Sequence, residues 1–270
     1  MKINTRFVSR VLCTFIREEL AKFGFKKGII GLSGGLDSSV CAALAAMALG
    51  PKNVLGLILP YKNTFKAELR DAQTVAGKLG IRWKMIDIAP MVDAYFSCYP
   101  TQDRVRIGNK MTRERMSILY DFSAQEKALV LGTSNKTELL LGYGTIHGDM
   151  ASAVNPLGDL YKTQVRQLAS YLKLPAKIQK KTPTAGLWPG QTDEGELGLT
   201  YAQIDRILFE LIDERKSPEE AAAAGFPKEA VEKIAAMIVG SEFKRKLPPI
   251  PKISARTVGL DFLYPYDRNR

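Results

Sequence analysis

The chain has 270 residues, with 39 Lys and Arg against 28 Asp and Glu and a formal net charge of +11. Its single histidine, His147, excludes a zinc site built on several histidines. Cys13, Cys41 and Cys98 form no CxxC pair, which argues against a disulfide framework or zinc ribbon and favours a cytoplasmic protein. The longest apolar run, 40–49, is far below the roughly 20 residues of a membrane span, so we expect no membrane partner.

The first part of the chain alternates short β-branched runs with helical patterns. In chain order, we predict a strand at 27–32, a helix at 38–49, a strand at 53–59, a helix at 65–79, a strand at 81–88, a helix at 104–127, a strand at 128–131 and a helix at 135–141. This alternation indicates a doubly wound parallel α/β sheet flanked by helices. Ligands of such sheets bind at the carboxyl ends of the strands, where the strand order reverses.

The rest of the chain is predicted to be loops and helices. Segment 142–159 holds four glycines and no clear period, as is typical of a functional or mobile loop. A helix at 161–172, an irregular segment at 182–198, helices at 201–214, 218–223 and 228–239, and an extended C-terminus follow. We expect one domain over residues 1–270, with an α/β core at about 20–175 and a helical C-terminal part at about 200–245.

The strongest chemical signal is GLSGGLDSS at 31–39, between a predicted strand and a predicted helix. Its adjacent glycines let backbone amides approach an anion, and the helix presents its positive N-terminal end. Serine hydroxyls add donors. The segment predicts a phosphate cradle, although it contains neither the common triphosphate-loop lysine nor the dinucleotide fingerprint. A plain turn with Ser38 as helix cap is the alternative.

Asp37 stands inside this cradle. A carboxylate repels a phosphate unless a cation lies between them, and Mg²⁺ prefers carboxylate and phosphate oxygens. We therefore predict Mg²⁺ as a cofactor, with a capping aspartate as the alternative.

Further motifs resemble those of the ammonia-dependent NAD synthetases, in the right order along nearly the whole chain. They are GN at 108–109 with RERM at 113–116, LGTSNKTE at 131–138, GDLYKTQV at 158–165, PTAGLWPGQTDE at 183–194 with GLTY at 198–201, and KR at 244–245. The glycine-rich loop itself resembles that of the wider ATP pyrophosphatases. The resemblance implies the Rossmann-like adenine nucleotide alpha-hydrolase fold, with a helical C-terminal part.

The resemblance also implies roles for individual residues. ATP would be bound by Gly31, Leu32, Ser33, Gly34, Gly35, Leu36, Asp37, Ser38, Thr133, Lys162 and Thr184. Asp37 and Glu138 would hold Mg²⁺, and Asp37 and Lys162 would be catalytic. Apart from the resemblance, ammonia is mostly ammonium at pH 7, so a carboxylate could attract it and take its proton, and Asp149 is our candidate for that catalytic role. Glu138 follows Asn135 by three residues, so a capping-box glutamate is the alternative.

By the same resemblance, Arg113, Phe243 and Lys244 would contact the dinucleotide substrate. Plainer interpretations remain open. Arg113 could belong to a solvated basic stripe, Lys162 could be an exposed helix lysine, and Thr184 could cap a turn.

The chain departs from the family pattern on the substrate side. Ile146 stands where the family has a lysine that contacts the nicotinate-bearing substrate, and His147 replaces a tyrosine. Ala153 stands at a substrate-binding aspartate, and Phe243 replaces a histidine. The ATP side is intact, so the changes indicate either drift or a relative that activates another carboxylate.

The resemblance implies an enzyme that amidates deamido-NAD with ATP and ammonia, giving NAD, AMP and pyrophosphate through an acyl-adenylate. The chain is too short to add a glutaminase domain, so we expect free ammonia or ammonia from a separate partner. The family implies a homodimer. No nucleic-acid partner is expected, because no RNA-binding module is recognisable. Two alternatives stay open: an RNA-modifying enzyme with the same ATP chemistry, and a nucleotide-binding module without catalysis.

Overall fold

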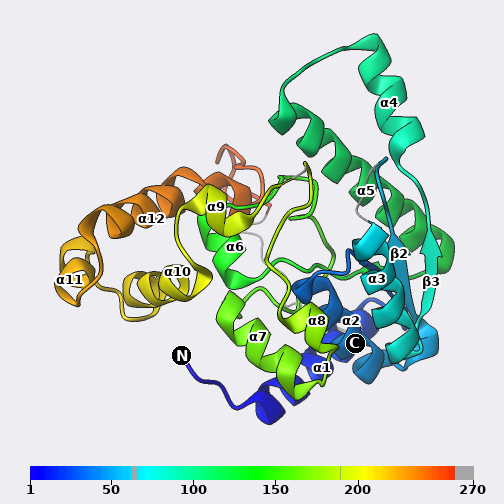
Figure 1. Ribbon diagram of the computed structural model, residues 1–270, viewed down its shortest axis with the longest axis horizontal. Coiled ribbons are helices and arrows are strands. Elements are labelled where there is room, and N and C mark those ends of the chain that lie inside the picture. Colours follow the sequence, from blue (N-terminus) through cyan, green and yellow to red (C-terminus); the bar gives the residue numbers. More distant parts are fainter. Residues whose placement is uncertain (63–65, 189, 259–270) are drawn as a thin grey trace.

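The computed structural model describes residues 1–62, 66–188 and 190–258. A parallel four-stranded sheet of order β3–β2–β1–β4 lies within it (Figure 1). The strands are β1 (Gly28–Gly31), β2 (Val54–Ile58), β3 (Arg82–Met85) and β4 (Leu129–Val130). The chain passes from β1 to β2 on one side, whereas β4 pairs with β1 on the other. The strand order therefore reverses between β1 and β4, where ligands of such sheets bind.

Helices cover both faces of this sheet. They are α1 (Thr5–Lys22), α2 (Leu36–Leu49), α3 (Lys66–Leu79), α4 (Ala89–Cys98), α5 (Arg104–Glu126), α6 (Lys136–Leu141), α7 (Lys162–Tyr171) and α8 (Ala176–Gln179), with a 3-10 turn at Pro51–Asn53. Successive strand residues face opposite sides, as strand geometry requires. Ile30 joins the core beneath α1, α2 and α7, whereas Ile29 packs with Met111 and Leu119 of α5.

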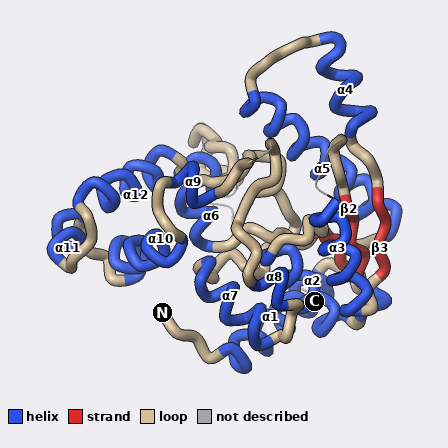
Figure 2. The backbone as a smooth tube through the Cα atoms, in the orientation of Figure 1, coloured by secondary structure: helices blue, strands red, loops and turns tan. Residues whose placement is uncertain are grey.

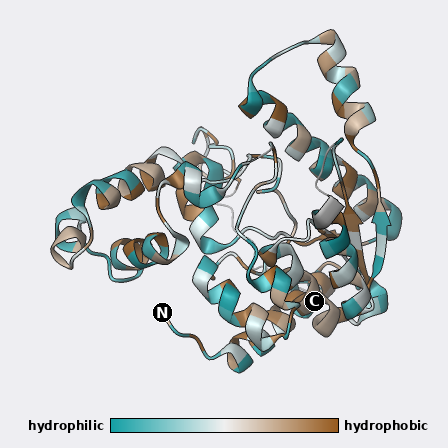
Figure 3. Cartoon of the chain, viewed as in Figure 1, coloured by the Kyte–Doolittle hydropathy of each residue, from teal (hydrophilic) through white to brown (hydrophobic). Residues whose placement is uncertain are grey.

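The helical C-terminal part holds α9 (Asp193–Leu197), α10 (Tyr201–Leu208), α11 (Pro218–Ala223) and α12 (Lys228–Gly240), with a π turn at Phe209–Asp213 and a 3-10 turn at Glu242–Arg245. These helices alternate apolar and polar residues (Figure 3). Their apolar residues form a third core, which also takes in Leu141 and Tyr161 from the α/β part. The helical part is thus packed onto α6 and the start of α7.

The α/β class and its strand order confirm the sequence prediction. Each predicted strand is present but shortened at its ends; the third was predicted at 81–88 and covers only Arg82–Met85. The loop predicted at 142–159 contains neither helix nor strand, apart from a single bridge between Leu131 and Val154. Residue 65, predicted to begin a helix, and the C-terminal residues 259–270 lie outside the described residues.

Several short or amphipathic helices were not predicted: α1, α4, α8 and α9. Helix α9 interrupts the segment predicted to be irregular at 182–198, and the helix predicted at 201–214 changes to a π turn at Phe209. No helix among the described residues has the length and apolar character that a bilayer crossing requires.

Candidate active site

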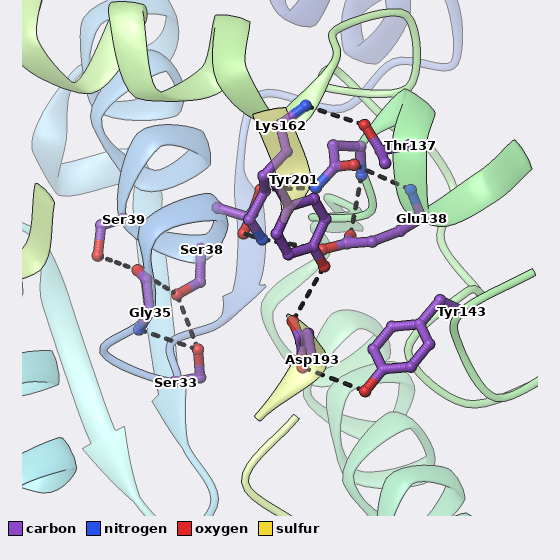
Figure 4. A network of polar contacts seen from close by, with 12 residues as sticks. Ser33, Gly35, Ser38, Ser39, Thr137, Glu138, Tyr143, Lys162, Asp193 and Tyr201 are labelled. Atoms are coloured by element: carbon purple, nitrogen blue, oxygen red, sulfur yellow. Dashed lines mark hydrogen bonds and ion pairs between the residues drawn. The ribbon is translucent and has the colours of Figure 1, made fainter. Parts of the chain in front are cut away.

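The loop after β1 turns directly into α2 and forms its own network of polar contacts (Figure 4). Ser33 Oγ accepts a hydrogen bond from the Gly35 amide at 3.2 Å and lies 3.0 Å from Ser38 Oγ. Ser39 Oγ donates to the Gly35 carbonyl at 2.6 Å. Gly35 is the N-cap of α2 and carries no capping side chain. The loop therefore aims the positive end of α2 at the switch point, as an anion site requires.

Gly34 allows this loop to pack closely against helix α3. Its φ is +73°, a conformation that side chains rarely adopt. A Cβ there would lie 2.6 Å from the carbonyl oxygen of Glu68 and 2.9 Å from the amide nitrogen of Ala72. Both atoms are backbone of α3, so only glycine allows the loop to lie against that helix.

Lys162 joins two predicted carboxylates at the centre of the site. Its Nζ lies 2.5 Å from Asp37 Oδ2 and 3.0 Å from Glu138 Oε1. The side chain is almost fully buried and passes over the ring of Tyr201. Asp37, Glu138 and Lys162 thus meet as the resemblance implied, and Lys162 is not an exposed helix lysine.

The charges of this cluster are strongly coupled. Burial raises the pKa of Glu138 to about 7, although the charge of Lys162 works in the opposite direction. Burial also opposes the charge on Lys162, but Asp37 and Glu138 together outweigh it and raise the pKa of the lysine. Lys162 therefore stays protonated and offsets one of the two carboxylate charges.

The alternative role of Glu138 is also realised. Asn135 accepts a hydrogen bond from the Glu138 amide at 3.0 Å, and Glu138 Oε2 accepts one from the Asn135 amide at 3.2 Å. This is a capping box at the start of α6. Asn135 Nδ2 also donates to Asp37 Oδ1 at 2.9 Å. The box therefore holds both carboxylates at fixed positions rather than excluding a role for Glu138 in binding.

The donor set fits magnesium only together with phosphate. Asp37 and Glu138 direct one oxygen each toward the same point, now taken by Lys162 Nζ. Within the described ranges, no three acidic, cysteine or histidine side chains gather into a metal site. Mg²⁺ commonly binds through one or two carboxylates and completes its shell with water and substrate phosphates. Two carboxylates beside a phosphate cradle match that pattern.

A buried aspartate from α10 supports this cluster from behind. Asp205 accepts hydrogen bonds from Thr137 Oγ1 at 2.6 Å and from the Thr163 amide at 2.7 Å. Thr137 Oγ1 in turn accepts from the Lys162 amide at 3.0 Å. Burial raises the pKa of Asp205, and its hydrogen bonds lower it in part. One carboxylate of the helical part therefore ties the start of α7 to α6.

The cluster and the loop face one cavity of about 550 Å³, a size typical of small-molecule sites. Figure 2 shows loop segments gathered in the middle of the molecule, and several lining residues of the cavity, among them Thr133 and Thr184, belong to such loops. The predicted residues that line it are Gly31, Leu32, Ser33, Gly35, Leu36, Asp37, Ser38, Thr133, Glu138, Asp149, Lys162, Thr184 and Lys244. Arg113 and Phe243, predicted to bind substrate, and Gly34 are not among its lining residues.

Those outlying residues have other contacts. Arg113 is exposed, and its Nε donates to the Ile146 carbonyl at 3.1 Å. Phe243 is 63% exposed. Thr184 lines the cavity but also closes a turn, because its hydroxyl donates to the Gln191 carbonyl and accepts from the Gly186 amide. The predicted roles of Arg113 and Phe243 in substrate binding and of Thr184 in ATP binding therefore stay predictions.

The loop predicted at 142–159 is held by two site residues. Asp149 Oδ1 accepts from the Thr145 amide at 2.7 Å. Lys244 Nζ donates to the carbonyls of Gly142 and Gly144 at 2.8 and 2.9 Å. Loss of contact with water raises the pKa of Asp149. The hydrogen bond from the Thr145 amide and the positive charges of Arg115 and Lys244 lower that pKa in part.

Sequence reasoning missed part of the cavity wall. Tyr201 and Tyr143 both donate to Asp193, at 3.0 and 3.2 Å (Figure 4). Asp193 is buried, and burial raises its pKa. Lys181 donates to the Gly34 carbonyl at 3.2 Å. Asp193 and Tyr201 lie within motifs of the resemblance, which was the one signal for them.

Comparisons with known proteins identify the family. The family model described as NAD synthase matches residues 8–248. The NH(3)-dependent NAD(+) synthetase of Trichlorobacter lovleyi is 50% identical over 99% of this chain and 98% of that protein.

Two solved structures share the fold, each covering 93% of this chain and 100% of the other. The NMN synthetase of Francisella tularensis has a TM-score of 0.83 and 35% identity, and the NH3-dependent NAD synthetase of Campylobacter jejuni has 0.80 and 34%. Because the family model spans most of its length and a curated relative is 50% identical over 99% of it, this chain belongs to the NAD synthase family.

Proposed function

We propose that this protein is a ligase that amidates deamido-NAD with ammonia and ATP, giving NAD, AMP and pyrophosphate. One observation carries the proposal: the phosphate cradle and the Lys162–Asp37–Glu138 cluster line a single cavity. The family match and the curated relatives support the same reaction.

The chemistry requires activation of a carboxylate, because an oxide is a poor leaving group. A substrate carboxylate oxygen attacks the α-phosphorus of ATP, and the bond to pyrophosphate breaks. Ammonia then attacks the carbonyl carbon of the acyl-adenylate, AMP leaves and one proton is lost. The loop at 31–38 and the N-terminus of α2 hold phosphate oxygens, and Lys162 offers positive charge beside them.

Magnesium fits beside this lysine. Asp37 and Glu138 would hold the ion, which would neutralise phosphate charge when bound. Lys162 and Asn135 keep the two carboxylates in place.

We propose that Asp149 attracts ammonium into the site and accepts its proton. Its carboxyl lines the cavity and is held by the Thr145 amide. A carboxylate there attracts ammonium, and its raised pKa suits it to accept the proton. Asp149→Asn should raise the KM for ammonium more than the KM for ATP.

The test is NAD formation from deamido-NAD, ATP, Mg²⁺ and ammonium chloride. We expect equal amounts of NAD, AMP and pyrophosphate, and loss of all three products in Asp37→Ala. Deamido-NAD labelled with ¹⁸O in its carboxylate should transfer one ¹⁸O to AMP if the acyl-adenylate forms. ATP cleavage without NAD would refute the proposal.

A mononucleotide substrate is the second candidate. The NMN synthetase of Francisella tularensis shares this fold at a TM-score of 0.83, and this chain departs from the resemblance at Ile146 and Ala153. The ratio of kcat/KM for deamido-NAD to that for nicotinic acid mononucleotide decides between them. A ratio above one supports the dinucleotide.

We also propose a homodimer in the cytoplasm. Large apolar side chains are exposed on neighbouring helices, among them Tyr95, Tyr99 and Val105. Such exposure is typical of a subunit interface. Sedimentation equilibrium measures the mass directly, and a monomer at micromolar concentration would contradict this proposal.

A further inference from the structure

Four basic side chains line the cavity, and they differ in their partners. They are Arg115, Lys162, Lys181 and Lys244. Lys162 pairs with Asp37 and Glu138, and Lys181 lies within 3.6 Å of Glu68 and Asp71. In the described part of the chain, Arg115 and Lys244 form no ion pair with a carboxylate. Two cavity cations therefore keep charge that a bound anion can neutralise.

Arg115 makes fewer hydrogen bonds than Lys244 does. Lys244 donates to two loop carbonyls, whereas Arg115 uses only Nε, which donates to the Leu59 carbonyl at 3.0 Å. Its Nη1 and Nη2 have no hydrogen-bond partner among residues 1–62, 66–188 and 190–258. Burial lowers its pKa, with the charges of Asp149 and Glu68 opposing that effect. The side chain is partly buried and lines the cavity, so its two unpaired nitrogens can donate to an anion bound there.

The contacts of Arg115 distinguish it from the lysines of the phosphate cradle. Lys162 Nζ lies 2.5 Å from Asp37 Oδ2, and Lys181 donates to the Gly34 carbonyl. Arg115 instead donates to Leu59, and its charge acts on Asp149, as that of Lys244 does, and on Glu68. The Nε contact with the end of β2 fixes the plane of the guanidinium, so that the remaining two nitrogens form a fork.

We propose that Arg115 binds an oxyanion of the pyridine nucleotide substrate through Nη1 and Nη2, with Lys244 as the second cation. The oxyanion is a phosphate or the carboxylate that is amidated. This inference rests on the proposed function. It assigns a substrate contact to an arginine two positions from Arg113, which is exposed and does not line the cavity.

The experiment measures equilibrium binding without turnover, by calorimetry, for wild type, Arg115→Lys and Arg115→Gln. We expect Arg115→Gln to weaken deamido-NAD about tenfold to a hundredfold, since a charge-assisted fork is lost. Arg115→Lys should recover part of this loss. The Kd of ATP should change less than about threefold, because the cradle lysines remain.

A parallel titration with NAD identifies the oxyanion. NAD keeps the phosphates and lacks the carboxylate. Equal weakening of NAD and deamido-NAD assigns Arg115 to a phosphate, and weakening of deamido-NAD alone assigns it to the carboxylate. Either result supports the proposal.

The matched control is Arg106→Gln. Arg106 lies on the same helix, is exposed and contacts Thr101 instead of the cavity, so its Kd values should match wild type. Thermal melts of each variant report folding, and Arg115→Lys serves if Arg115→Gln is unstable.

Two outcomes overturn the role of Arg115: unchanged binding of deamido-NAD in both variants, or a loss confined to ATP. A wild-type protein that binds neither deamido-NAD nor nicotinic acid mononucleotide overturns the proposed function, and this inference with it.

Discussion

At the scale of single residues, Lys162 carries the electrostatics of the site. All four carboxylate oxygens of Asp37 and Glu138 have a partner, two on Lys162 and two on Asn135. Two carboxylates held this close are tolerated because one buried ammonium lies between them.

Lys162→Met should therefore destabilise the fold and strongly lower activity. Removing one partner of a buried ion pair costs about 3 kcal/mol, and loss of the cation beside the phosphates lowers kcat on the order of a hundredfold or more. Urea unfolding and NAD formation measure the two effects.

The effect on stability should depend on pH. Without Lys162, the pKa of Glu138 rises above its present value of about 7, further above its unfolded value. At pH values between the unfolded and the folded pKa of Glu138, the folded state then binds more protons than the unfolded state. The free energy of unfolding of the variant therefore falls as the pH rises through this range. The variant should lose more stability at pH 8 than at pH 5. Equal losses at both pH values would contradict this account.

Lys177→Met is the control for Lys162→Met. Lys177 Nζ lies 2.6 Å from Asp71 Oδ1, but the lysine side chain is 65% exposed. Asp71 is buried, but it keeps Lys181 at 3.5 Å when Lys177 is lost. The solvated Lys177 should therefore contribute only about 0–1 kcal/mol. Stability and activity should stay near wild type.

Local sequence predicted the site residues that lie next to a turn. Asp37 follows the glycines, and Glu138 follows a strand end, so pattern alone placed both at the sheet edge. The contact of Asp205 with Thr137 joins residues 68 positions apart, and no local pattern indicates such a pair. Arg115 stood inside a noted motif, but its orientation depends on how α5 packs against β2.

At the scale of elements, the packing of the cradle against α3 depends on Gly34. Gly34→Ala would place a Cβ 2.6 Å from a backbone oxygen of α3, and backbone cannot give way as a flexible side chain can. We expect a loss of about 2 kcal/mol in stability and at least a tenfold rise in the Kd of ATP. Thermal unfolding and calorimetry test this.

Gly24→Ala separates strain from displacement of the loop. Gly24 has φ +77°, and a Cβ there meets no atom within 4 Å. The substitution should cost about 1 kcal/mol through backbone strain alone, with unchanged ATP binding. Weaker ATP binding in both variants would show that general instability, rather than the cradle, is responsible.

Asp205 couples α10 to the start of α7. Asp205→Asn keeps the shape but replaces a charged acceptor of two hydrogen bonds. We expect a stability loss of about 2 kcal/mol and a fall of about tenfold in kcat, because Lys162 loses its fixed position. In a Lys162→Met background, Asp205→Asn should lower activity no further.

The control for Asp205→Asn is Ser217→Ala, which removes the N-cap of α11. It should cost about 1 kcal/mol and leave kcat unchanged, since α11 lies away from the cavity. An additive loss of activity in the Asp205→Asn/Lys162→Met pair would show a general structural role instead.

The periodicity of apolar residues predicted whether a segment is a helix or a strand, but it did not predict the residue at which each element ends. The alternation of apolar runs and helical patterns predicted the sheet, because buried parallel strands read as continuous apolar runs. Helix α1 was missed because basic residues interrupt its sequence, yet Cys13, Ile16 and Leu20 still form one buried face. This apolar face is buried because α2 and α7 share a core with it. The sequence of α1 alone does not indicate that packing.

At the scale of the whole molecule, the switch point and the helical part form the cavity together. The sheet supplies the cradle, and Asp193 and Glu196 from the helical part add a wall, with Tyr201 donating a hydrogen bond to Asp193. The third core joins Leu141 and Tyr161 to the helices at 197–234. We therefore propose that residues 1–258 form one folding unit, not two domains.

The proposal predicts that damage in the helical part unfolds the sheet as well. Leu208 is fully buried in the third core, so Leu208→Ala should cost about 2–5 kcal/mol. Far-UV circular dichroism follows all helices, while fluorescence of Trp83 in β3, in a Trp188→Phe background, follows the sheet. In one unit, both urea midpoints fall together, because unfolding is cooperative. A variant in which only the dichroism midpoint moves would show two separate units. Val239→Ala, at a site 74% exposed, should leave both midpoints unchanged.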